Sequence, residues 1–176
     1  MAQDHYAEYR DESFLDHVGL SHLGASLKTF WPQRGPQWDA LGTTFKGPVL
    51  VEAKAHTKEF LSPASQAGAA SHAMIARAFG AMHDDLGLIS PCDWTKAFYQ
   101  YGNRLAHLWW LRNNGVDASL LFVSFVHDTE MRGPVLPETW HAMFAAANHA
   151  LGLSSGMDLM KHVHHVTPDV RELYVA

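Results

Sequence analysis

Hydrophobic residues recur at helical spacing in four stretches of the chain. Trp31-Pro32 ends the first stretch, because the residue before a proline disfavours helical backbone angles. Ser62 followed by Pro63 is typical of a helix start. Asp93 is expected to cap the third stretch. The predicted helices span residues 11–30, 63–86, 93–113 and 137–151.

Four other segments have the composition of strands, namely residues 37–44, 48–56, 119–127 and 160–166. The third of these is nearly all apolar, as expected for a strand that is buried on both faces. Lys46-Gly47 is expected to form a two-residue hairpin turn between the first two. Alternating helices and strands predict an α/β fold with a mixed central sheet flanked by helices. Without a linker or an internal repeat, residues 1–176 are expected to form one domain.

The strand at 48–56 carries two charged residues, Glu52 and Lys54, on an otherwise apolar segment. Side chains alternate along a strand, so both charges face the same side of the sheet. Burying them is costly, which leaves two interpretations: a salt bridge at an exposed strand end, or an active-site pair. With a two-residue turn, Asp39 pairs with Lys54 and Leu41 with Glu52, so that Asp39, Glu52 and Lys54 share one face.

Two carboxylates and a lysine on one face are suited to phosphodiester hydrolysis. Carboxylate oxygens bind a hard divalent cation such as Mg²⁺. The cation polarises a phosphodiester and lowers the pKa of a bound water. A neighbouring lysine can orient that water or stabilise the developing negative charge.

The sequence Trp38-Asp39, twelve intervening residues and Glu52-Ala53-Lys54 resembles the PD-(D/E)XK nuclease superfamily. The resemblance implies a restriction-endonuclease-like fold and a nuclease that acts on nucleic acid, with DNA favoured over RNA. It also implies Mg²⁺ or Mn²⁺ bound by Asp39, Glu52 and the Ala53 carbonyl, with Lys54 in the catalytic role. The chain departs from the pattern in two ways. Its proline lies three residues before Asp39, and the strand usual before that aspartate would have to lie within residues 30–34.

The same resemblance extends to residues outside the motif. The helix before the motif often supplies a further acidic ligand, and Glu8, Glu12 and Asp16 are equal candidates. Gln100-Tyr101 loosely matches a glutamine and tyrosine found on a later helix in some branches.

The predicted third helix has a polar side opposite its apolar face, made of Lys96, Gln100, Asn103, Arg104 and His107. Such a side is usually solvated, but it can also line a phosphate-binding cleft. Gln100 and Arg104 are the candidate substrate contacts on it. His56, two residues beyond Lys54, is a candidate auxiliary base or phosphate contact.

Composition sets the wider limits. The net charge is −5, which argues mildly against a general nucleic-acid coat protein, but five of the bases lie within residues 28–58 around the motif. A single cysteine excludes an internal disulfide and suits a cytoplasmic protein. No apolar run is long enough to cross a membrane, and no secretory signal is visible.

Of the 13 histidines, His162 and His164 are expected to share a strand face, where they would hold a transition metal or simply be exposed.

Other classes of enzyme lack their motifs. The chain has no G-x-S-x-G nucleophile elbow, no phosphate-binding loop, and no basic partner near Cys92 in sequence. The remaining alternative is a catalytically inactive binding or scaffold domain of the same fold. A cation between Asp39 and Glu52 would favour the nuclease, and a Lys54 bridged to both carboxylates would favour the scaffold. A homodimer is the partner suggested by analogy with compact nucleases.

Overall fold

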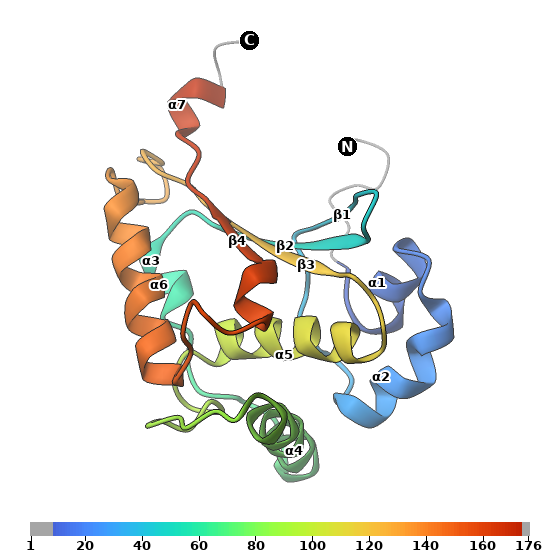
Figure 1. The fold of residues 1–176 in the computed structure, drawn as a ribbon. Helices are drawn as coiled ribbons and strands as arrows, with labels where there is room; N and C mark the ends of the chain where they lie inside the picture. The colour runs from blue at the N-terminus through green and yellow to red at the C-terminus, as the bar shows by residue number, and fades with distance from the viewer. Residues whose placement is uncertain (1–8, 174–176) are drawn as a thin grey trace.

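The structure is a computed structural model that describes residues 9–173. These residues form four strands, seven α-helices and two short 3₁₀ helices (Figure 1). In chain order they are α1 (Asp11–His17), η1 (Ser21–Leu23), α2 (Gly24–Phe30), β1 (Ala40–Thr43), β2 (Pro48–Lys54), α3 (Thr57–Phe60), α4 (Ala69–Leu86), α5 (Tyr99–Asn113), β3 (Ser119–Ser124), α6 (Pro137–Leu151), η2 (Leu159–His162), β4 (Val163–Val166) and α7 (Val170–Leu173).

The four strands form one mixed sheet in the order β1-β2-β3-β4. The β1 and β2 strands are antiparallel, whereas β2, β3 and β4 run parallel. Helices connect the parallel strands, because parallel neighbours need a long crossover. The expected α/β fold with a mixed central sheet is therefore confirmed.

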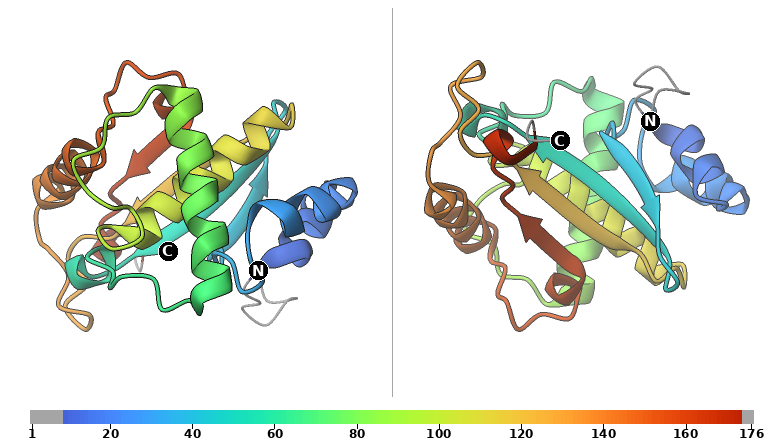
Figure 2. Two further views of the ribbon diagram at one scale, coloured as in Figure 1. Left: turned by 90° about the horizontal axis from the view of Figure 1, so that it is seen from below. Right: turned by 90° about the horizontal axis from the view of Figure 1, so that it is seen from above.

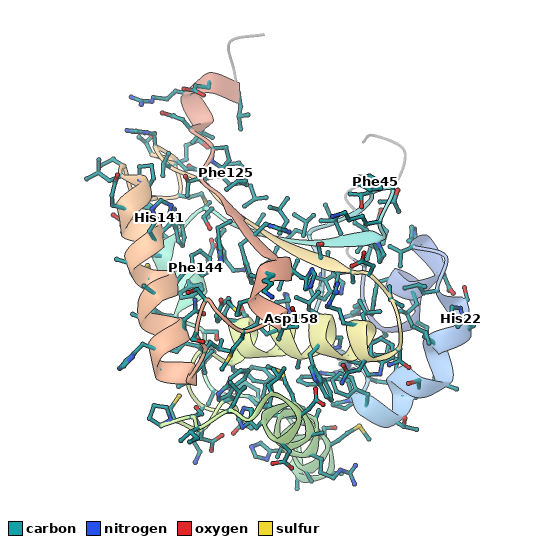
Figure 3. The ribbon with its side chains drawn as sticks, in the orientation of Figure 1. His22, Phe45, Phe125, His141, Phe144 and Asp158 are labelled. Carbon is teal, nitrogen blue, oxygen red and sulfur yellow. The ribbon has the colours of Figure 1, made fainter. Side chains whose placement is uncertain are left out.

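The long helices gather on one face of the sheet. Seen from below, α4 crosses α5, which lies under the strands, whereas from above the strands lie in front of both helices (Figure 2). On the covered face, Leu50, Leu120 and Phe122 are at most 2% exposed. Phe144 of α6 points into this core and contacts Phe122, with 5.2 Å between ring centroids (Figure 3).

The opposite face of the sheet is only partly shielded. Along β2 and β3, buried residues alternate with residues of intermediate exposure. The expectation that residues 119–127 form a strand buried on both faces is therefore wrong. The strand ends at Ser124, and the side chains of Leu121 and Val123 face the open side.

The hairpin turn is longer than expected. The register pairs Ala40 with Val51 and Thr43 with Pro48, which leaves a four-residue turn over 44–47 rather than a two-residue one. The Thr44 hydroxyl accepts hydrogen bonds from the N–H groups of Lys46 and Gly47, which closes the turn. A Cβ at Gly47 would lie 2.3 Å from the Asp117 carbonyl oxygen, so this position requires glycine.

Three predicted helix starts or spans are wrong. The first predicted helix is divided between α1 and α2, because Gly19 has a φ of +75° that no helix can contain. The α4 helix begins at Ala69, and the Ser62 hydroxyl accepts the N–H of Gln100 instead of capping a helix. Helix α5 begins at Tyr99, because Phe98 has a left-handed φ of +51°.

Local hydrogen bonds explain why Asp93 does not cap α5. Its carboxylate accepts bonds from the backbone N–H and the hydroxyl of Thr95, and the hydroxyl bond is the main reason that its pKa falls to about 2.

Residues 30–34 contain no strand, and instead Tyr9 forms an antiparallel bridge with Trp38. None of the helices in the described part of the chain is long and apolar enough to span a membrane.

Two neighbouring residues of β2 should differ in their effect on stability. Leu50→Ala removes a fully buried side chain and should lower the free energy of unfolding by about 2–5 kcal/mol. Val51→Ala, on the open face, should cost roughly 1 kcal/mol or less. Urea denaturation of both variants and the wild type measures the difference. Equal losses would contradict the one-sided covering of the sheet.

Candidate functional site

The hairpin brings Asp39 next to Glu52. Asp39 directly precedes β1, and its N–H donates to the Val51 carbonyl at 3.2 Å. The strand pairing ends at Ala40 and Val51, and because the Asp39 N–H bonds to the Val51 carbonyl, Asp39 lies beside Val51 rather than across from Lys54 as expected. The two carboxylates are close enough for the charge of Glu52 to act on Asp39, but Asp39 is exposed whereas Glu52 is buried on the covered face of the sheet.

The Asp39 carboxylate is held by the neighbouring strand. Its Oδ2 accepts the N–H of Ala53 at 2.7 Å, so the side chain replaces a backbone carbonyl as partner for that amide. Oδ1 has no hydrogen-bond partner within residues 9–173. Asp39 therefore presents one oriented and available carboxylate oxygen at the edge of the sheet.

Glu52 is 2% exposed and forms two ion pairs. Its Oε1 pairs with the ammonium of Lys54, and its Oε2 accepts from Nε of Arg104 at 2.6 Å. A carboxylate buried this deeply needs such partners, because an unpaired buried charge costs several kcal/mol. Lys54 is bridged to Glu52 but not to Asp39, so the arrangement expected of a scaffold is only half present.

Arg104 connects the sheet to α5. Its Nη1 donates to the side-chain oxygen of Asn103 at 2.8 Å and its Nη2 to the Gln37 carbonyl at 2.9 Å. The guanidinium also lies 5.0 Å from the ring centroid of Trp38, within cation–π range. All three nitrogens of the guanidinium are thereby used, and the orientation of Arg104 is fixed.

Part of the polar side of α5 is buried. Asn103, Arg104 and His107 are 6%, 7% and 1% exposed, so they do not form a solvated helix face. The apolar pattern did not show this, because the partner that makes burial favourable is Glu52, on a distant segment of the chain.

The pKa of Asp39 is raised. Asp39 is exposed as a residue, but its carboxyl group turns toward the strand, and this loss of solvent is the largest cause of the shift. The Glu52 charge raises the pKa further, whereas the Ala53 N–H, Lys54 and Arg104 lower it. A cation at this position would favour the ionised form of Asp39.

The donors at the site suit Mg²⁺ or Mn²⁺ in kind. Mg²⁺ commonly takes one or two carboxylates and keeps several waters, and the Asp39 and Glu52 carboxylates and the Ala53 carbonyl are oxygen donors of the kind that it takes. No group of three or more His, Cys, Asp or Glu side chains in the described residues is placed to hold a metal. One Glu52 oxygen would have to exchange Lys54 or Arg104 for the metal, because both oxygens are already paired.

Sequence reasoning missed Glu59, which lies on α3 directly after the motif. Its Oε2 accepts the Ala55 N–H at 3.3 Å, and its side chain lines a void of about 10 Å³ together with Glu52 and Lys54. The sequence feature that could have indicated Glu59 is an acidic residue seven positions after Glu52. A helix of four residues is too short to produce a periodic pattern that would place it.

A larger cleft of about 570 Å³ is bordered by Arg104, the partner of Glu52. Its walls are the loops at 31–37 and 63–68 and the first turns of α5. Gln100 and Arg104, the two predicted substrate contacts, both line this cleft. Arg104 also pairs with Glu52, so one side chain borders both the cleft and the carboxylate, although Asp39, Glu52 and Lys54 do not themselves line the cleft.

The other candidate residues lie elsewhere. His56 follows the end of β2 and caps α3, where its Nδ1 accepts the backbone N–H of Lys58 at 2.8 Å. Glu12 pairs with Lys28 at 2.9 Å, and Asp16 is exposed on α1. Neither is among the charged groups that act on Asp39. Glu8 lies outside the described residues.

The histidines do not form the predicted pair on a strand face. His162 belongs to η2 and His164 to β4, so the expectation that they share a strand face is wrong. His165 is exposed as a residue, but its ring stacks on Phe122, and this loss of solvent at the ring, with the nearby His141 and His164, lowers its pKa to about 4. Burial lowers the pKa of His107 to about 3.

Comparisons with protein-family models, with curated proteins and with solved structures find no match for this chain.

Removing Arg104 should expose the cost of burying Glu52. Arg104→Met leaves the carboxylate with Lys54 alone and should lower the free energy of unfolding by about 3–5 kcal/mol. Adding Glu52→Gln should recover part of that loss, because the buried charge is then gone. Urea denaturation measures both, with Arg77→Met on the exposed side of α4 as control. An Arg104→Met variant as stable as the control would contradict the role of this ion pair.

His107 should make the protein sensitive to acid. The unfolded chain takes up a proton near pH 6.5, whereas the folded chain does so only near pH 3. The stabilisation is therefore present above pH 6.5 and is lost as the pH falls, by about 1.4 kcal/mol per unit. His107→Phe should show a shallower decline in urea denaturation between pH 7 and pH 5. The same shallowing in His22→Phe, an exposed position, would contradict the assignment to burial.

Proposed function

We propose that the chain is a metal-dependent nuclease of the PD-(D/E)XK type, with the restriction-endonuclease-like arrangement of its sheet and helices. The observation that carries the proposal is that Asp39 binds the segment of β2 that carries Glu52 and Lys54, through the Val51 carbonyl and the Ala53 N–H, while Lys54 pairs with Glu52. Three charged residues from a short hairpin are concentrated where the sheet is otherwise apolar.

Each residue of the group has a role in phosphodiester hydrolysis. Asp39, Glu52 and the Ala53 carbonyl hold Mg²⁺ or Mn²⁺, and when bound the metal polarises the phosphodiester and lowers the pKa of a water ligand. The Lys54 ammonium, held by Glu52, orients the attacking water and stabilises the negative charge that develops on the phosphate. Arg104 fixes Glu52 from the other side and supplies a second positive charge.

The proposed substrate is nucleic acid, with DNA favoured over RNA. The cleft beside the carboxylates contains arginines but no acidic residue, so phosphate groups are not repelled there. This local charge matters more than the overall charge of −5, since a substrate at the site interacts mainly with the nearest groups.

A second candidate is a non-catalytic nucleic-acid-binding domain. The observation in its favour is that both Glu52 oxygens are paired with cations of the protein and that Asp39 accepts the Ala53 N–H. In that case the charged group would only stabilise the hairpin against α5.

Cleavage assays on single-stranded DNA, duplex DNA and RNA with Mg²⁺ or Mn²⁺ distinguish the two candidates. The wild type should cleave, and EDTA should abolish cleavage. Asp39→Asn can still accept the Ala53 N–H, so it should fold and yet lose about 100-fold or more in rate. Lys54→Met should lose a similar factor.

Matched controls are Asp16→Asn on α1 and Lys58→Met on α3, both exposed positions. These variants should retain the wild-type rate, and circular dichroism should show that all four proteins are folded. The nuclease is rejected if the wild type cleaves no substrate with either metal. It is also rejected if Asp39→Asn cleaves as fast as Asp16→Asn.

A further inference from the structure

The cleft beside the carboxylate site has an unusual composition for this chain. Among its lining residues are four glutamines, one asparagine and two arginines, but no aspartate or glutamate. The chain as a whole carries 18 acidic residues against 13 lysines and arginines. Among the described residues, the cleft therefore has one unpaired cation, Arg34, because Arg104 is paired with Glu52, and is otherwise rich in neutral hydrogen-bonding groups.

Several of these groups are available to a ligand. The side-chain amides of Gln33, Gln66 and Gln100 make no hydrogen bond within residues 9–173. Asn103 is only 6% exposed, and its oxygen accepts from Arg104, but its Nδ2 has no hydrogen-bond partner in the same part of the chain. This nitrogen is not among the fully buried polar atoms that lack a partner, so it is accessible to a ligand in the cleft.

The cleft also offers groups for an anion and for an aromatic ring. Arg34 lies exposed on its wall, and arginine is the side chain best suited to phosphate, whereas the guanidinium of Arg104 is already bound to Glu52, Asn103 and the Gln37 carbonyl. The loop that carries Arg34 is fixed, because the Asp11 carboxylate accepts the N–H groups of Arg34 and Gly35. Tyr99, of intermediate exposure, presents a ring on which a base can stack.

Amides, arginines and an aromatic ring together match the parts of a nucleotide. Glutamine and asparagine pair with base edges, arginine with phosphate, and tyrosine with the face of the base. A volume of about 570 Å³ lies within the range of small-ligand sites, whereas a double helix has no room to enter it. A base enters such a site only when it is unpaired.

We propose that this cleft binds one unpaired nucleotide, so that single-stranded DNA or a frayed strand end is the substrate class of the neighbouring site. The inference rests on the proposed nuclease function. Arg104 connects the two, because it lines the cleft and donates to Glu52. The cleft and the Glu52 carboxylate therefore lie on either side of one arginine side chain.

Fluorescence anisotropy in EDTA tests binding without cleavage. The probe is a labelled single strand of about 12 nucleotides, and its blunt duplex is the comparison. The single strand should bind at least about 10-fold more tightly, and free deoxyadenosine monophosphate should displace it. Gln100→Ala and Arg34→Ala should each weaken binding by roughly 5- to 10-fold, the loss of about one hydrogen bond or phosphate contact.

Two variants at exposed positions of α5 and α4 serve as controls. Asn113→Ala removes an exposed amide at the far end of α5, and Arg77→Ala removes an exposed arginine of α4. Both should bind the single strand like the wild type. Equal affinity for strand and duplex, or equal losses in cleft and control variants, would overturn the inference.

The cleavage assay separates this inference from the proposed function. A protein that cleaves DNA but prefers blunt duplex refutes the cleft and leaves the nuclease standing. A protein that cleaves nothing but binds the single strand through Gln100 and Arg34 supports the cleft and refutes the nuclease.

Discussion

The buried carboxylate of Glu52 is the constraint on which the rest of the structure depends. It lies on the covered face of β2, where an unpaired charge would cost several kcal/mol. Lys54, on the same strand, pairs with one oxygen of this carboxylate, but the cation that pairs with the other oxygen, Arg104, comes from α5. The rotation of α5 about its axis follows from this contact, because Arg104 must face the sheet. Asn103 and His107 are buried with it on the inner side of the helix.

Arg104 also explains why a structural ion pair and an open cleft are neighbours. Its remaining donors hold Asn103 and the Gln37 carbonyl, so the loop at 31–37 is fixed against the start of α5. The stacking of the guanidinium on Trp38 fixes the residue that precedes Asp39. One side chain therefore positions the catalytic candidates on one side and the wall of the cleft on the other. Changes on either side are expected to affect both.

The sequence allowed the hairpin and the shared face of Glu52 and Lys54 to be predicted, because alternation along a strand is a local property. Helix α6 begins and ends as predicted, since Pro137 starts it and Gly152 has a left-handed φ of +74°. The turn length was not predictable, because it depends on bonds from the Thr44 hydroxyl. The burial of the polar side of α5 was not predictable either, because its cause is a partner 52 residues away. Glu59 escaped notice because a single helical turn leaves no periodic pattern.

The sequence separation of the Glu52–Arg104 pair bears on the order of folding. The β1–β2 hairpin closes over a few residues, and such local contacts form within microseconds. Contacts across 52 residues form later, because closing the longer loop costs more entropy. Until α5 docks, Glu52 remains hydrated on the surface of the hairpin. Its desolvation and the arrival of Arg104 are then one event, so we expect no folding stage at which the carboxylate is buried without its cation.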